Sequence, residues 1–301
     1  MNRTTRPPVE LAPLPRAERE RARRALALRR WLAGQVLVYA ILIVVALIFF
    51  VPLLWMGFSS FKSLDETLTP DIRWLPSQWH VENYTAMLSD NQFGTFFFNS
   101  TIVAISVTAI NLFVSSLAGY GLAKFHFPGR TLIFLFILSI MMVPFQVIVI
   151  PLYIIVRHLG WINTYWGLII PGGVTGFGVF FMRQSIITVP SEFFEAARLD
   201  GAGELYIYRR ILLPLISPAL AALGVLTFLG SWNNLLWPLL VVQKDSLKTL
   251  PIGLAQMATS QYGVQYNLLM TGAAISALPV ILVFLGARSY FVRGITMGGM
   301  K

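Results

Sequence analysis

The sequence predicts an all-α integral membrane protein with six transmembrane helices. Two observations carry this prediction. The chain is 56% hydrophobic and only 12% charged, with a mean hydropathy of +0.69, whereas soluble domains carry about 25% charged residues. Uncharged windows also recur along the chain, each long enough for the roughly 20 apolar residues that cross a bilayer. The spans must be helices because backbone groups in lipid need internal partners.

The windows follow one another with short polar segments between them. They cover residues 31–61 (core 36–56), 91–123, 131–156, 159–182, 211–243 and 249–287 (core 268–285). Prolines within them predict kinks or span ends. Gly172 and Gly176 in the fourth window have the small-xxx-small spacing that lets helices pack closely, and a gating hinge there is the alternative.

The distribution of positive charge predicts that both termini are cytoplasmic. With this orientation, 18 of the 23 Lys and Arg residues lie inside, as the positive-inside rule requires. Nine arginines fall in residues 1–30, which we expect to form a disordered cytoplasmic tail near anionic lipid. The membrane domain then covers residues 31–292, and residues 293–301 form a flexible C-terminal tail.

A charged island, EAARLDGAGELYIYRRILLP at residues 195–214, separates the fourth and fifth windows on the predicted cytoplasmic side. Ser191 is the expected N-cap of a first short helix, with acidic residues in its first turns. Gly201 can adopt positive φ and so predicts a turn. A second helix should run from Glu204 to about Leu213, where Pro214 interrupts the pattern.

The island also resembles a family signature. Glu195-Ala196-Ala197, three residues, Gly201, nine residues and Ile211-x-Leu213-Pro214 are similar to the EAA loop of binding-protein-dependent ABC importer permeases. The resemblance extends over about residues 35–301, through AGYGLA at 118–123, GSWNNLLWP at 230–238 and RGITMGGMK at 293–301. It is closest to the smaller six-span subunit of carbohydrate importers of the maltose type.

The resemblance implies the ABC importer type I permease fold, with cytoplasmic EAA coupling helices in an EAA loop at residues 190–214. It implies that the chain imports an oligosaccharide or other carbohydrate across a bacterial or archaeal inner membrane. The implied partners are a second permease subunit in a heterodimer, an ATPase dimer that binds ATP and Mg, and an extracytoplasmic solute-binding protein. That protein would dock on the outside loop at residues 59–91, for which an interfacial segment with aromatic anchors is the compatible alternative.

The same resemblance implies roles for particular residues. The expected ATPase-coupling residues are Glu195, Ala196, Ala197, Arg198, Asp200, Gly201, Ile211, Leu213 and Pro214. The C-terminal segment offers further ATPase contacts at Gly294, Thr296 and Gly298, with a frayed end as the alternative.

Polar residues at membrane depth indicate a solute path. Trp232, Asn233 and Asn234 could line it or its gate, because amides pair with sugar hydroxyls and aromatic faces pack on sugar rings. Hydrogen bonds between helices are the alternative for these amides. For Asn111 and Gln146, such interhelical bonds are the favoured interpretation.

Several absences from the sequence restrict the function. There is no G-x-x-x-x-G-K-[ST], no HExxH and no cysteine, and the three histidines fall in separate loops. We therefore expect no catalytic residue, metal site or cofactor in this chain, and no nucleic acid partner. A polyol, glycerol phosphate or another non-sugar remains an alternative solute. A stand-alone secondary transporter or channel and a non-transporting scaffold remain alternative classes, although no charged residue lies mid-span to couple an ion gradient.

Overall fold

The computed structural model describes residues 16–259 and 263–298, and the side chains of residues 34–259, 263–288 and 290. The chain divides into two compact units, residues 1–55 and residues 56–301. The first unit holds most of helix α1 (Arg16–Ser59), in which Gly34–Ser59 is long and apolar enough to cross a membrane. Every side chain from Gly34 to Leu54 is exposed, so this helix presents an apolar surface to its surroundings.

The helical start of α1 corrects one expectation. Residues 16–30 belong to the helix, whereas the sequence analysis assigns them to a disordered tail. Their Ala, Leu, Glu and Arg residues are strong helix formers, and the arginines that suggested disorder do not oppose helix formation. Residues 1–15 of the predicted tail lie outside the described residues.

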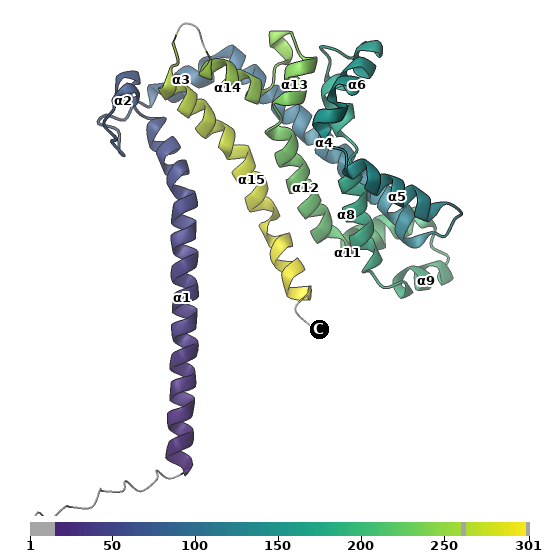
Figure 1. Ribbon diagram of the computed structural model, residues 1–301. Coiled ribbons are helices and arrows are strands. Elements are labelled where there is room, and N and C mark those ends of the chain that lie inside the picture. Colours follow the sequence, from purple (N-terminus) through teal and green to yellow (C-terminus); the bar gives the residue numbers. More distant parts are fainter. Residues whose placement is uncertain (1–15, 260–262, 299–301) are drawn as a thin grey trace, which may run out of the picture. The chain divides into compact units, whose positions relative to one another are not determined.

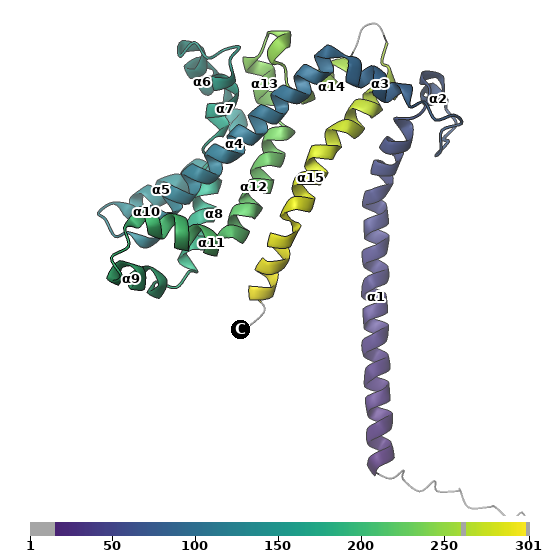
Figure 2. The same cartoon turned by 180° about the vertical axis from the view of Figure 1, so that it is seen from behind.

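The second unit is all-helical in its described part and is organised around α4 (Asn91–Lys124). This helix crosses the unit from end to end (Figure 2) and packs on α8 (Gly176–Ile187) and α12 (Ser217–Trp232), while α12 also packs on α15 (Tyr266–Gly298). Among the described residues, α4 and the Tyr266–Arg288 part of α15 are long and apolar enough to span a membrane in this unit, as α1 is in the first. Three bent helix pairs raise the number of candidate spans from three to six if each pair counts as one span. The predicted six spans are thus the upper end of this range.

Three of the candidate spans are bent helix pairs (Figure 1). α5 (Arg130–Met141) and α6 (Phe145–His158) meet at 102°, the helical segments Tyr165–Gly172 and Gly176–Ile187 at 42°, and Glu204–Leu215 and α12 at 77°. Pro144 precedes α6 in extended conformation, which a helix cannot continue through. Pro214 does not interrupt its segment, however: the backbone stays helical to Leu215 and bends at Ile216.

Glycines allow α4 and α8 to approach closely. A Cβ atom at Gly119 would lie 2.9 Å from the backbone nitrogen of Arg183, and one at Gly178 would overlap Ser115 and Asn111. Gly176 would meet Met141 of α5 at 3.0 Å. The predicted packing role is therefore confirmed for Gly176, whereas a Cβ atom at Gly172 would meet only Val107 at an ordinary 3.5 Å.

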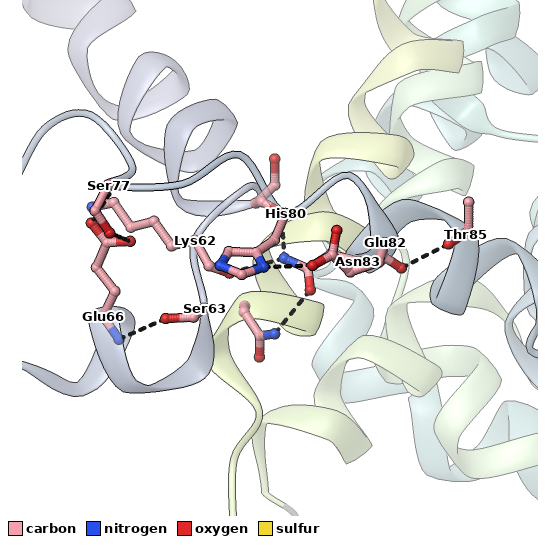
Figure 3. Close-up of polar contacts among 10 residues, drawn as sticks. Lys62, Ser63, Glu66, Ser77, His80, Glu82, Asn83 and Thr85 are labelled. Carbon is pink, nitrogen blue, oxygen red and sulfur yellow. Dashed lines mark hydrogen bonds and ion pairs between the residues drawn. The ribbon is translucent and has the colours of Figure 1, made fainter.

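The segment between α1 and α4 contains α2 (Leu64–Leu68) and α3 (Glu82–Ser89) and is held by buried polar contacts (Figure 3). The Asn83 side chain donates to the carbonyls of Ser60 and Lys62 at 3.0 and 2.9 Å. The Lys62 ammonium donates to the Arg73 carbonyl at 2.5 Å. Glu66 accepts hydrogen bonds from the Ser77 backbone and hydroxyl. This loop is thus ordered by these contacts and by α15, whose Thr271 hydroxyl donates to the Ser60 carbonyl at 2.9 Å.

The remaining short helical elements either belong to the bent pairs or connect the spans. They are α7 (Tyr165–Ile169), the 3₁₀ turn η1 (Ile170–Gly172), α9 (Glu192–Leu199), α10 (Glu204–Tyr206), the π-helical η2 (Ile207–Leu212), α11 (Leu213–Leu215), α13 (Leu236–Val241), the 3₁₀ turn η3 (Asp245–Leu247) and α14 (Leu250–Ala258).

Candidate functional site

The charged island forms a helix–turn–helix segment, residues 192–215, in which α9 is followed by the continuous helical stretch α10, η2 and α11. The turn is a Schellman motif: the Gly201 amide donates to the Arg198 carbonyl at 3.0 Å, and the Ala202 amide to the Ala197 carbonyl at 2.9 Å. Gly201 has φ of +81°, as the sequence predicts. The motif satisfies the last carbonyls of α9 without help from another chain.

The start of α9 differs in detail from the prediction. Ser191 occupies the N-cap position, but its backbone is already helical and its hydroxyl makes no capping bond. Its carbonyl instead accepts from the amides of Phe194 and Glu195 at 3.0 and 3.1 Å. The predicted hydroxyl cap is therefore wrong, because the helical φ and ψ of Ser191 are not those of a capping residue.

One face of the helix–turn–helix segment is buried against α4 and α8 of the second unit. This face contributes Phe194, Ala197, Ile207, Tyr208 and Leu212 to a single apolar cluster with Tyr120 of α4 and with Met182 and Ile186 of α8. Such burial of several large side chains stabilises the contact by about 1.5–3 kcal/mol for each of them. The segment is consequently a fixed part of the unit rather than a loose connector.

Polar contacts fix the same face. Glu204 accepts hydrogen bonds from the Tyr120 hydroxyl and from Arg198 Nε, both at 2.7 Å. The bond to Glu204 raises the pKa of the Arg198 guanidinium above its ordinary value, so Arg198 is charged at any physiological pH. The hydroxyls of Ser116 and Tyr208 lie 2.6 Å apart in the interior. The sequence analysis missed these anchors, since their partners come from a span more than 80 residues away.

The opposite face of the segment is exposed and mixed in character. It carries the Glu195 carboxylate, which has no hydrogen bond or ion pair among the described residues. Leu199 is 87% exposed, and Phe193, Leu205 and Tyr206 are also exposed. We call these four apolar residues and Glu195 the outer face. Exposed apolar side chains beside charged ones are typical of a protein interaction surface.

The predicted coupling residues divide between the two faces. Ala197 is buried, and Ile211 and Leu213 are half-buried. The exposed members are Glu195, Ala196, Arg198, Asp200, Gly201 and Pro214. Gly294, Thr296 and Gly298 lie in the last turns of α15, which continues past the start of the predicted tail; their side-chain surroundings lie outside the described residues.

A cavity of about 300 Å³ lies where the broken spans meet α4, and we call it the central cavity. Its polar lining includes Ser231, Asn234 and Thr249, and none of the described residues that line it is charged. Thr249 is 3% exposed, and its hydroxyl has no hydrogen-bond partner among the described residues. A buried hydroxyl without a partner is costly.

The predicted path residues do not all reach the central cavity. Asn234 lines it, and its Oδ1 accepts from the Trp237 amide at 3.3 Å. Asn233 is exposed elsewhere. Trp232 is 3% exposed, stacks on Phe228 and donates from Nε1 to the Ser276 carbonyl at 3.1 Å, so it belongs to the core between α12 and α15.

Trp237 lines the central cavity but is only 3% exposed, so the exposed aromatic surface there comes from Phe145 and Phe177 and not from the predicted Trp232. The interhelical bond expected of Asn111 is confirmed, because its amide donates to Thr175 Oγ1 at 3.0 Å. Gln146 is exposed, and its predicted interhelical bond is not formed among the described residues.

Broken spans around an uncharged cavity, joined to an exposed helix–turn–helix, define a membrane permease. The "Binding-protein-dependent transport system inner membrane component" family matches residues 111–297. The chain belongs to this family, and it is a permease of the ABC importer class, as the resemblance implies.

Similar proteins agree with this assignment. The chain is 38% identical to "Arabinooligosaccharides transport system permease protein AraQ" of Halalkalibacterium halodurans over 85% of this chain and 93% of that protein. It is 34% identical to "Diacetylchitobiose uptake system permease protein NgcG" of Streptomyces coelicolor, over 82% of each chain. It is 36% identical to "sn-glycerol-3-phosphate transport system permease protein UgpE" of Yersinia enterocolitica, over 72% of this chain and 76% of that one.

A solved structure supports the fold. The crystal structure of a bacterial ABC transporter involved in import of the acidic polysaccharide alginate contains a chain with a TM-score of 0.76, at 22% identity, covering 86% of this chain and 96% of that one. The type I permease fold expected from the sequence is thereby confirmed.

Proposed function

We propose that this permease carries a neutral oligosaccharide through the membrane and that the central cavity is part of its path. The absence of charge from the lining of the central cavity carries this proposal. Hydroxyl and amide groups can pair with sugar hydroxyls, and Phe145 and Phe177 offer exposed apolar surfaces for a sugar ring. The names of AraQ and NgcG refer to oligosaccharide uptake, which agrees with such a lining.

Glycerol phosphate is the second candidate solute, because the name of UgpE refers to it. A phosphate in a low-dielectric cavity needs a cationic partner. The central cavity offers none, which favours the neutral solute.

The outer face is the surface that we assign to the ATPase partner. Its exposed leucines and aromatic residues would be covered in such a contact, and Glu195 would find a donor there. ATP and Mg would bind on that partner, since the sequence has no phosphate-binding loop. This assignment places the helix–turn–helix segment and both termini in the cytoplasm, and residues 59–91 outside, where a solute-binding protein would dock.

The contacts that Glu204 and Tyr208 make with α4 explain how motion could pass from the ATPase to the solute path. Glu204 ties the segment to α4 through Tyr120, and Tyr208 ties it there through Ser116. α4 also lines the central cavity. A displacement of the segment by the ATPase would therefore shift a wall of the cavity. Together with a second permease subunit, this gives alternating access across the membrane.

The ATPase contact is tested with Leu199→Ser, which removes the most exposed apolar side chain of the outer face. Burial of a leucine contributes about 1.5–3 kcal/mol, so we expect ATPase association with the purified complex to weaken by about tenfold or more, and ATP-driven uptake into proteoliposomes to fall with it. Leu75→Ser is the matched control, because Leu75 is also exposed but lies in the outside loop. Unchanged ATPase association in Leu199→Ser would contradict the docking assignment, and uptake without ATP would indicate a stand-alone carrier.

The solute assignment is tested with a pair of adjacent asparagines. Asn234→Leu removes a polar group from the central cavity, whereas Asn233→Leu changes an exposed residue outside it. We expect the KM for arabinooligosaccharide uptake to rise about tenfold in Asn234→Leu, with one hydrogen bond lost, and to stay unchanged in Asn233→Leu. Uptake of glycerol 3-phosphate in preference to neutral sugars would refute the proposed solute class.

A further inference from the structure

A second hollow of about 630 Å³ opens at the junction of α4, α5 and α8, away from the central cavity. Arg130 at the start of α5 and Arg183 on α8 both line it, together with His126 and Phe134. We call it the basic hollow. The two arginines come from segments more than 50 residues apart, so only the packing of α5 on α8 brings their charges into one space.

Both guanidinium groups are held in place by the end of α4. Arg130 donates from Nη1 to the Phe125 carbonyl at 3.0 Å, and Arg183 donates from Nε to the Leu122 carbonyl at 3.3 Å. The Arg183 guanidinium also lies 3.8 Å from the centroid of the Phe134 ring. Each guanidinium keeps further N–H donors for another partner. They are thus preorganised and not merely solvated surface charges.

The charge of the basic hollow is not balanced within the described part of the chain. No carboxylate there forms an ion pair with Arg130 or Arg183, and both side chains are half-buried. Like charges in a partly desolvated space repel each other. A bound anion would remove this repulsion and accept the remaining hydrogen bonds.

The first turn of α5 adds to the same positive field. Gly129 is in the left-handed conformation, and no side chain caps the helix that begins after it. The first amide groups of a helix have no partner within it and favour anions. An anion between the two arginines would therefore also lie at the positive end of α5.

The surface next to the basic hollow is apolar. Leu132 is 73% exposed, and Leu135 and Phe136 of α5 are exposed as well. A ligand with a phosphate group and long hydrocarbon chains matches both surfaces at once. Basic hollows between membrane helices at the cytoplasmic side recognise such headgroups.

We propose that the basic hollow binds the headgroup phosphate of an anionic phospholipid, with its acyl chains along α5. One guanidinium group can donate two parallel hydrogen bonds to the oxygens of a phosphate. The placement in the cytoplasmic leaflet rests on the orientation given under the proposed function. The lipid would hold α5 against α8, next to the helix–turn–helix segment.

The test is native mass spectrometry of the full chain, purified with whatever subunits accompany it, stripped of lipid and then titrated with phosphatidylglycerol. Phosphatidylcholine and inorganic phosphate are the comparison ligands. The double variant Arg130→Gln/Arg183→Gln should bind phosphatidylglycerol about thirtyfold more weakly, from about 1 kcal/mol for each cationic contact. The control Arg157→Gln/Lys244→Gln removes two exposed positive charges elsewhere and should bind as the unaltered chain does.

The variant Arg130→Lys/Arg183→Lys retains the charge and should keep an intermediate affinity, which guards against a general loss of folding in the glutamine variant. Equal phosphatidylglycerol binding by the glutamine and control variants would overturn the proposal. The proposal would also be overturned if the chain bound phosphatidylcholine as tightly as phosphatidylglycerol, or if inorganic phosphate competed equally well. It would be overturned as well if the glutamine variant lost an associated subunit and kept its bound lipid. If the chain is purified without an ATPase, the proposed function is refuted. The lipid titration can still be carried out on the chain alone, so the two proposals fail separately.

Discussion

Gly201 gives the most direct test of the helix–turn–helix segment. Its φ of +81° lies in the left-handed region, and a Cβ atom added there would meet no heavy atom within 4 Å. Substitution therefore introduces backbone strain without a steric clash. The series Gly201→Asn, Gly201→Ala and Gly201→Val increases that strain stepwise, because Asn tolerates the left-handed conformation and a β-branched residue resists it most.

The expected magnitude follows from the conformation alone. A residue other than Gly or Asn loses about 1–2 kcal/mol in the left-handed region, and Val loses more. A cost of this size lowers the population of the intact turn by a factor of about 5 to 30. Because α9 carries part of the outer face, a disrupted turn should separate ATP hydrolysis from solute uptake while the spans remain inserted.

The assay is ATP-driven solute uptake and ATP hydrolysis, measured together in proteoliposomes that contain the purified complex. Uptake per ATP should decrease in the order Asn, Ala, Val. Gly203→Ala is the matched control, since Gly203 has φ of −73° and open space around its Cα. Normal coupling in Gly201→Val, or an equal defect in Gly203→Ala, would refute the reasoning.

Three further changes test the packing that supports the candidate site. Ser116→Ala leaves the buried Tyr208 hydroxyl without its partner and should cost about 1–3 kcal/mol, whereas Tyr208→Phe should cost less, because the Ser116 hydroxyl still donates to the Phe113 carbonyl; the double variant should cost less than the sum, and additive losses in thermal unfolding would contradict this. Arg198→Gln breaks a pair whose side chains are 39% and 44% exposed, so the loss should stay below about 1 kcal/mol and shrink in high salt; a larger, salt-independent fall in Tm would show that the pair is more than a surface contact. Asn99→Leu leaves two loop carbonyls without their donor and should cost about 3 kcal/mol, while a Tm equal to that of the exposed-site control Asn91→Leu would argue against it.

The sequence predicted much of this protein because its strongest signals are local or compositional. The number of spans follows from hydropathy, since a bilayer imposes one length on every helix. The Gly201 turn follows from the one residue type that adopts positive φ at little cost. The helix–turn–helix between spans follows from charged residues that lipid would not accept.

Other features could not be read from the sequence, because they depend on which distant segments meet. The 102° break between α5 and α6 turns an apparently straight apolar window into two helices, and hydropathy does not distinguish these forms. Trp232 and Trp237 lie in one motif, yet only their orientations on α12 and α13 decide that the first is core and the second lines the central cavity.

By itself, the sequence thus determined the class of protein, the membrane spans and the position of the turn, because composition, span length and backbone conformation are local properties. The tertiary structure alone decided that Glu204 is held by Tyr120, that Thr249 lines the central cavity with no hydrogen-bond partner for its hydroxyl among the described residues, and that Arg130 and Arg183 share one hollow. Each of these depends on helices packing across long sequence separations, where the same side chain can be an anchor, a lining residue or a surface charge according to its neighbours.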